Sequence, residues 1–179
     1  EVSWMMAEEN KPVFDRDKEI LPGGACRPTE NAGAAGRVCV TYGRNVVMNK
    51  QVVSVIKDLG IQPLVMQDKK YAEKPLAEFV AAYPDIQFVV AILSADDWVY
   101  PKEGKPKDAG LRADQQVVFH LGYWFGKLGR ERVFALYYDQ RSFQWPTKFL
   151  DLIYTPLDKG GLWQKELILR LKQFGLLNS

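Results

Sequence analysis

The segment Gln87-Phe88-Val89-Val90-Ala91-Ile92-Leu93 is the most apolar run of the chain, and it decides the fold. An unbroken apolar run of this length is typical of a strand that is covered on both faces of a parallel sheet. We therefore expect this segment at the centre of a sheet. It follows a predicted helix around Pro75–Ala82, to which Tyr83-Pro84 connects it.

Upstream of this strand, the chain alternates between strand and helix patterns. Arg37–Thr41 is a short β-branched run that predicts a first strand, and Asn45–Leu59 has apolar residues at helical spacing. Gly60 is placed to cap that helix at its carboxyl end, and Ile61–Met66 predicts a second strand. The apolar positions of the helix are Val46, Val52, Val53, Ile56 and Leu59.

The alternation continues downstream. Trp98–Gly110 contains two prolines and two glycines and is predicted as a loop. A long helix over Arg112–Leu128 carries an apolar face and ends at Gly129. The remaining predicted elements are a strand at Arg132–Tyr138, a turn at Trp145-Pro146, a strand at Leu152–Thr155 and a helix from about Leu162 to Phe174.

Five strands that alternate with helices predict an α/β domain with a parallel sheet covered on both faces. Right-handed crossovers make it doubly wound, and we expect the flavodoxin-like strand order 2-1-3-4-5. The Pro-, Gly- and Ala-rich residues before this domain have little to bury, so residues 1–36 are predicted as a flexible arm or linker and residues 37–179 as the domain.

The composition excludes several classes of protein. The 179 residues carry a formal charge of +2, which predicts no nucleic-acid or membrane partner, and no apolar run approaches the length of a membrane span. The two cysteines and single histidine predict neither a disulfide framework nor a metal site, so we expect a cytoplasmic protein. The N-terminus does not look like a signal peptide, and a start at Glu1 suggests an excised piece of a longer chain.

Ligands of such sheets bind beyond the carboxyl ends of the strands, at the switch point between strands one and three. The first loop at this point is Tyr42-Gly43-Arg44-Asn45. Its glycine permits a tight turn, its asparagine can cap the next helix, and its arginine can fork onto a phosphate or carboxylate. A plain strand-to-helix turn with a solvated arginine is the alternative interpretation.

The second loop at the switch point is Ser94-Ala95-Asp96-Asp97-Trp98. Its carboxylates can hold ribose hydroxyls and its indole can stack a base, or the same residues can simply cap and turn the chain. No GxGxxG follows the first strand and no GK[ST] occurs, so hydride transfer on a Rossmann site and phosphoryl transfer on a Walker A loop lose most of their support.

His120 is the only histidine, and it lies at the edge of the apolar face of the predicted helix Arg112–Leu128. A histidine in such a place is more commonly a partly buried, hydrogen-bonded residue than a catalyst. No serine or cysteine is placed in the sequence so as to suggest a histidine-activated nucleophile.

Several segments between residues 37 and 178 resemble the TIR-like nucleotide-binding proteins of bacterial defence systems. The helix from Phe119 to Arg130 is similar to the family's F-E-L-G-Y-F-x-G-K-L-G-R motif, except that His120 stands at the glutamate. The other matching segments are Val38 to Asn45, which resembles a strand with an H-G-R-N turn, Leu59 to Pro63, Leu93 to Asp97, which resembles a T-P-D-D loop, and Ile153 to Asp158 with Trp163.

The resemblance implies NAD⁺ glycohydrolysis in antiviral defence, with NAD as a substrate or ligand and no resident cofactor. It also implies self-association on activation and control by a module that senses a cyclic nucleotide. The nucleotide site would be lined by Tyr42 to Asn45, Ser94 to Asp97 and Trp98, with His120, Asp96 and Asp97 as the candidate catalytic residues.

Two departures from the family pattern lie in this one crevice. A carboxylate can stabilise the oxocarbenium-like state of glycosidic cleavage, whereas the imidazole of His120 cannot supply that negative charge. Tyr42 stands where the family often has histidine. We therefore favour a domain that binds a nucleotide but has lost or weakened NAD⁺ hydrolysis. The alternatives are an active hydrolase that uses Asp96 or Asp97, and an interaction scaffold that captures partners through residues 1–36.

Overall fold

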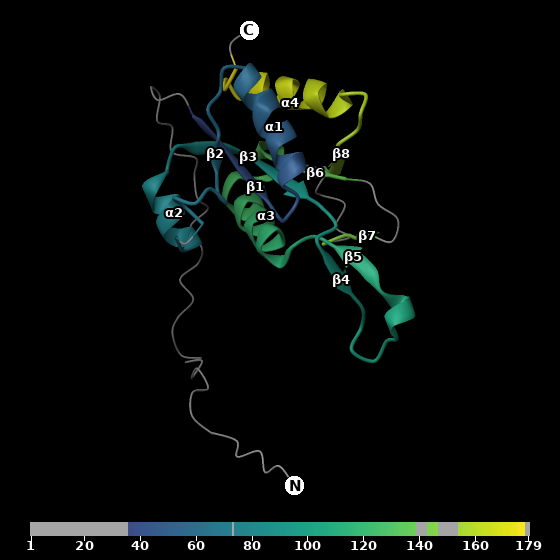
Figure 1. Cartoon of the computed structure of the whole chain (residues 1–179). Helices are drawn as coiled ribbons and strands as arrows, with labels where there is room; N and C mark the ends of the chain where they lie inside the picture. The colour runs from purple at the N-terminus through teal and green to yellow at the C-terminus, as the bar shows by residue number, and fades with distance from the viewer. Residues whose placement is uncertain (1–35, 73, 139–142, 147–153, 178–179) are drawn as a thin grey trace, which may run out of the picture.

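A computed structural model of the chain describes residues 36–72, 74–138, 143–146 and 154–177. Its centre is a five-stranded sheet in the order β2-β1-β3-β6-β8, and every neighbouring pair in it is parallel (Figure 1). The predicted doubly wound, flavodoxin-like α/β fold is therefore confirmed. The strands are β1 (Arg37–Tyr42), β2 (Leu64–Val65), β3 (Ile86–Leu93), β6 (Val133–Tyr137) and β8 (Tyr154–Pro156).

The apolar segment that decides the fold forms β3, the middle strand of the sheet. It pairs with β1 on one side and β6 on the other, and Val89 to Leu93 are all fully buried. A strand with both neighbours parallel and both faces covered has no solvent-facing side, which explains why it shows no alternation of polar residues.

Within the described residues, four helices cover the sheet, two on each face (Figure 1). Side chains of α1 and α4 pack with Val38, Val40 and Phe134 on one face, and side chains of α2 and α3 pack with Val89 and Ala91 on the other. Each core contains one fully buried tryptophan. The helices are α1 (Val46–Asp58), α2 (Leu76–Ala82), α3 (Gln115–Leu128) and α4 (Leu162–Gln173), and the tryptophans are Trp163 and Trp124.

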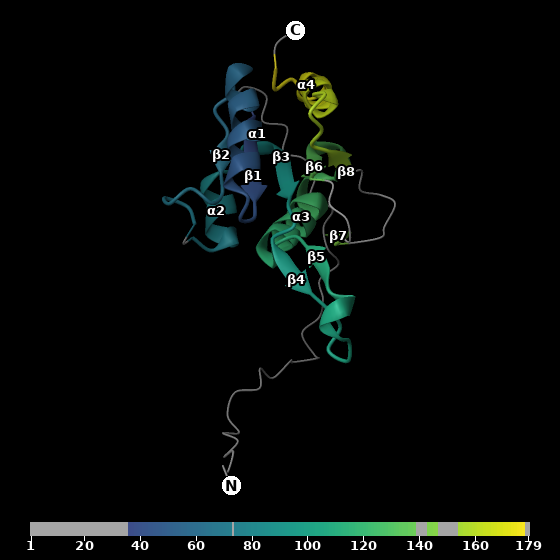
Figure 2. The same cartoon turned by 45° about the vertical axis from the view of Figure 1, so that its right-hand side comes forward.

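A second, smaller sheet was not predicted. The predicted loop Trp98–Gly110 is flanked by two short strands that pair antiparallel, and a third strand joins them in parallel. The first two extend beyond the carboxyl edge of the main sheet (Figure 2). The segments are β4 (Asp97–Val99), the 3-10 helix η1 (Pro106–Asp108), β5 (Gly110–Arg112) and β7 (Phe143–Gln144). Runs of two or three residues are too short to leave a periodic pattern in a sequence.

Two element boundaries differ from the prediction for identifiable reasons. Helix α3 begins at Gln115 because Asp114 is its N-cap, with Oδ1 2.8 Å from the backbone N of Gln116. The second strand has only two residues, where Ile61–Met66 was predicted. The backbone N–H of Ile61 instead bonds to Ile56 O at the end of α1, and Gly60 has the positive φ of 80° that this ending requires.

The remaining boundaries agree within about two residues, and a second 3-10 helix, η2 (Arg130–Arg132), precedes β6. Residues 1–35 lie outside the described residues, as do residues 152 and 153 of the predicted last strand, so the proposed arm stays a prediction. No described helix is long and apolar enough to cross a bilayer.

Candidate functional site

The two loops named by the sequence meet at the carboxyl edge of the sheet, beside the start of α3. β1 and β3 are neighbours there, with Tyr42 paired to Ile92. The backbone N of Arg44 lies 3.2 Å from Oδ1 of Asp96, which joins the first loop directly to the second. This crevice is the switch point of the strand order, where ligands of such sheets bind.

Asp96 holds three segments of the crevice together. Its Oδ1 accepts a hydrogen bond from the Ser94 hydroxyl at 2.8 Å as well as from Arg44 N, and its Oδ2 accepts from Asp114 N at 3.3 Å. Gly43 makes this approach possible, because a Cβ at that position would overlap the Asp96 carboxylate and press on Asp114. The carboxylate that the sequence offers as a catalyst therefore has both oxygens in hydrogen bonds to the protein.

Arg44 pairs with two carboxylates of the crevice. Its Nη2 is 3.2 Å from Asp97 Oδ1 and its Nε is 3.7 Å from Asp114 Oδ2, and 70% of its side chain is exposed. Exposed ion pairs of this kind contribute about 0–1 kcal/mol, so the guanidinium can turn toward a phosphate at little cost. Asp114 was absent from the sequence-based site, although an Asp just before an apolar helix is a recognisable N-cap.

Asn45 caps a helix, whereas Trp98 is exposed. The side-chain oxygen of Asn45 accepts a hydrogen bond from Met48 N at 3.1 Å, so Asn45 is the N-cap of α1, as the sequence predicted. Trp98 is on β4 directly after Asp97, and it is 73% exposed. An exposed indole is able to stack on a planar ring.

His120 reaches the crevice from α3 through a chain of hydrogen bonds that the sequence did not reveal. Its Nδ1 lies 2.9 Å from Thr41 Oγ1, and Thr41 Oγ1 lies 3.1 Å from Gln67 Nε2. The other amide atom of Gln67, Oε1, accepts from the backbone N of Tyr42 at 3.2 Å. We call the connected groups of Tyr42, Gln67, Thr41 and His120 the relay.

The environment of His120 favours its neutral form. The residue is only 5% exposed, and burial lowers the pKa of the imidazole below its ordinary value of 6.5. The carboxylate of Asp114 raises this pKa and so opposes part of the effect. The group at this position is thus an uncharged ring near neutral pH.

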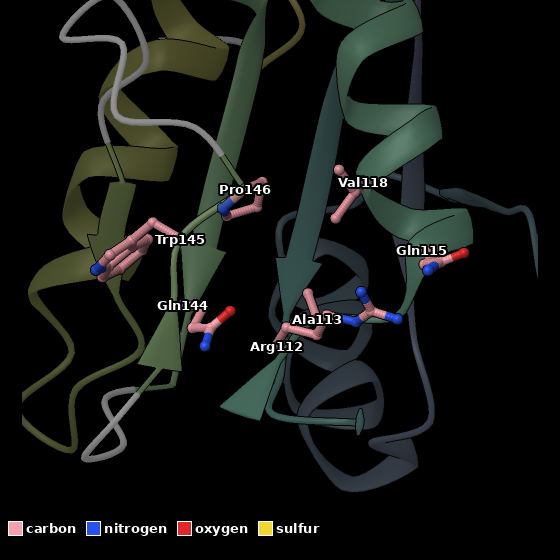
Figure 3. Close-up of a pocket in the computed structure, with 7 residues that line it drawn as sticks. All are labelled: Arg112, Ala113, Gln115, Val118, Gln144, Trp145 and Pro146. Atoms are coloured by element: carbon pink, nitrogen blue, oxygen red, sulfur yellow. The ribbon is translucent and has the colours of Figure 1, made fainter. Parts of the chain in front are cut away.

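A cavity of about 220 Å³ lies on another side of the start of α3 (Figure 3). Figure 3 shows β7 and Pro146 facing Ala113 and Val118 across it, while the ring of Trp145 points away. That ring packs against Tyr137, with centroids 4.7 Å apart. None of the lining residues was proposed as a site residue from the sequence. The complete lining is Arg112, Ala113, Gln115, Val118, Gln144, Trp145 and Pro146.

No cluster of three His, Cys, Asp or Glu side chains that could hold a metal ion occurs within the described ranges. The three aspartates of the crevice face Arg44 and backbone N–H groups instead.

Comparison with known proteins assigns the chain to a family. A family model described as "CAP12/Pycsar effector protein, TIR domain" matches residues 37–159. The chain belongs to this family. It is a defence-associated family of TIR-like domains, as the motifs around Tyr42, Asp96 and His120 predicted.

Relatives of this TIR domain are longer than the chain. The uncharacterized Escherichia coli (strain K12) protein YuaY is 26% identical over 141 residues, which cover 78% of the chain and 46% of that protein. Protein tirC of Dictyostelium discoideum is 25% identical over 103 residues, 56% of the chain and 51% of that protein. The chain thus spans about half the length of the curated relatives it matches.

Among solved structures, a mutant flavo di-iron protein from Thermotoga maritima aligns with a TM-score of 0.44 and 17% identity. The alignment covers 80% of the chain and 36% of that protein, and we draw nothing about function from it.

Proposed function

We propose that this TIR domain binds NAD or a related nucleotide in the crevice between the β1 and β3 loops, and that NAD⁺ hydrolysis is lost or strongly reduced. The observation that carries the proposal is the environment of His120, the residue that the motif resemblance aligns with the family's glutamate. Its imidazole is buried and its pKa is lowered. The proposal takes this ring to occupy the place of a carboxylate.

The chemistry of glycosidic cleavage explains why this change matters. Positive charge develops on the ribose in an oxocarbenium-like transition state, and a carboxylate stabilises that charge. A neutral imidazole offers no such charge, and a protonated one repels the developing cation. One electrostatic group that stabilises a transition state contributes a factor of about 10²–10³ to the rate. We therefore expect the rate of NAD⁺ hydrolysis to be lower by at least this factor than it would be with a glutamate at residue 120.

The other crevice residues suit nucleotide binding. In this proposal the guanidinium of Arg44 turns from Asp97 to a phosphate of the ligand, and the exposed ring of Trp98 stacks on a base. Asp97, released from Arg44, is then able to accept hydrogen bonds from ribose hydroxyls. NAD is a ligand here, and the proposal includes no resident cofactor.

NAD⁺ consumption by the purified protein and by a His120→Glu variant tests the proposal, at high protein concentration so that assembly is possible. We expect an inactive wild type, binding of NAD⁺ by calorimetry, and a gain of at least tenfold in hydrolysis in His120→Glu. His120→Gln, which removes the ring without adding charge, is the matched control and should stay inactive. Turnover by the wild type would contradict the proposal.

An active glycohydrolase is the second candidate, favoured by the carboxylates of Asp97 and Asp114 around Arg44. If the wild type turns over NAD⁺, Asp97→Asn and Asp114→Asn identify the carboxylate involved. Asp96 is a poorer candidate, because both of its oxygens are bonded to Ser94, Arg44 and Asp114.

The family name includes the Pycsar effector, which supports a role in a cyclic-nucleotide response. We propose that a sensor module elsewhere in a longer protein controls this domain and that activation involves self-association. A cytoplasmic location is part of the proposal, and the free, buried thiol of Cys39 is compatible with a reducing compartment. The scaffold alternative predicts that removing residues 1–36 abolishes partner capture and leaves nucleotide binding unchanged.

A further inference from the structure

The donors and acceptors of the relay are determined by its first hydrogen bond, the one between Tyr42 and Gln67. The backbone N–H of Tyr42 can only donate, so the atom of Gln67 that faces it, 3.2 Å away, is the amide oxygen. The amide NH₂ of Gln67 then faces Thr41 and donates to its hydroxyl at 3.1 Å. The orientation of this amide is thus fixed by the main chain of β1.

The hydroxyl of Thr41 in turn determines whether Nδ1 of His120 donates or accepts. Thr41 is fully buried, so its own proton needs an acceptor. Of its two side-chain partners, Gln67 Nε2 is a donor, and only His120 Nδ1, 2.9 Å away, can accept. Nδ1 therefore carries no proton, and the proton of the neutral ring is on Nε2.

This form of the ring determines what His120 can offer a ligand. With its lone pair bonded to Thr41, the imidazole has no free nitrogen to act as a base. Its remaining polar group is the Nε2–H, a hydrogen-bond donor without charge. Glutamate at the same place would instead be an anionic acceptor that attracts a cationic ring.

We propose that Gln67 and Thr41 are positioning residues that hold His120 as a neutral Nε2–H donor. The crevice then takes a nucleotide whose group next to His120 is an uncharged or anionic hydrogen-bond acceptor, such as a reduced dinucleotide, in preference to the cationic nicotinamide of NAD⁺. The part of this inference that concerns the ligand rests on the proposed function.

The state of the ring is directly measurable, since the chain contains a single histidine. Nitrogen-15 NMR of the imidazole at pH 7 should show the Nε2–H tautomer in the wild type. Gln67→Glu should reverse the hydrogen bond between Thr41 and His120. A carboxylate oxygen facing Thr41 accepts the hydrogen bond of the hydroxyl, so the Thr41 oxygen is left to accept one from Nδ1–H of His120. The ring should then carry its proton on Nδ1 or become doubly protonated.

Gln62→Glu is the matched control, since Gln62 is an exposed glutamine just before β2 and the variant makes the same change in charge. It should leave the tautomer unchanged, and Thr41→Ser, which keeps the hydroxyl, should leave it unchanged as well. An Nδ1–H ring in the wild type, or an unaltered ring in Gln67→Glu, would overturn the relay.

Calorimetric binding of NADH and NAD⁺, which differ by one ring charge, tests the ligand. The wild type should bind NADH at least as tightly as NAD⁺, and His120→Glu should shift the ratio of the two dissociation constants about tenfold toward NAD⁺. A wild type that prefers NAD⁺ as strongly as His120→Glu does would overturn the ligand half of the inference. Absence of binding to either nucleotide would overturn the proposed function, and the NMR result would still decide the relay.

Discussion

At the residue scale, the proposed chemistry of the crevice depends on one position, His120. The motif resemblance marks it as a departure from the family pattern. The structure adds that its ring bonds to Thr41, 79 residues away, and that the residue is buried. Thr41 and Gln67 could not be found from the sequence, because a threonine in a strand and a glutamine after one carry no signal of their own.

The lowered pKa of His120 predicts how stability depends on pH. Between the folded pKa and the ordinary value of 6.5, the unfolded chain binds a proton that the folded protein refuses, so stability falls as the pH decreases through this interval. Each unit between the two pKa values corresponds to about 1.4 kcal/mol. Between pH 7.5 and 5, the free energy of urea unfolding should fall more steeply for the wild type than for His120→Gln. The same pH dependence in both proteins would contradict the lowered pKa.

At the scale of elements, strong and long patterns were predictable and short pairings were not. The apolar run of β3, the helical spacing of α1 and the Gly60 cap were recognisable in the sequence. The alternation of strands and helices, with right-handed crossovers, then predicted the strand order that the sheet has. The smaller sheet of β4, β5 and β7 depends on pairings such as Leu111 with Phe143. These two residues lie in separate segments, one between β3 and α3 and the other between β6 and β8. Asp114 was missed because the predicted helix began at Arg112, whereas β5 ends at Arg112 and α3 begins only after Asp114.

The turn between β1 and α1 makes a prediction about glycine. Gly43→Ala should destabilise the protein by about 1–3 kcal/mol, since its Cβ would displace the Asp96 carboxylate that ties the loops together. Gly126→Ala is the control: it lies in α3 with open space around it, and better helix propensity should stabilise by up to about 1 kcal/mol. Chemical denaturation measures both, and equal effects would show that the crevice turn tolerates a side chain.

At the scale of the whole molecule, the two described cores lie on opposite faces of one sheet and are built from residue 38 onward. If the domain begins at residue 37, as the composition predicts, residues 1–36 are not required for folding. A protein that begins at Gly36 should therefore melt within about 1 °C of the full chain, a shift below the roughly 2–8 °C that 1 kcal/mol produces in domains of this size. A large drop in melting temperature would show that part of residues 1–36 contributes to the stability of the folded domain.

Trp124 and Trp163 are each fully buried, one in the core of each sheet face. The chain has five tryptophans, so fluorescence reports on one layer alone only when the other four are replaced. Two variants that keep Trp124 or Trp163 as the single tryptophan, with phenylalanine at the other four positions, give a separate optical probe for each layer. Spectroscopy of the two variants can then show whether the layers on the two faces of the sheet unfold together or in sequence.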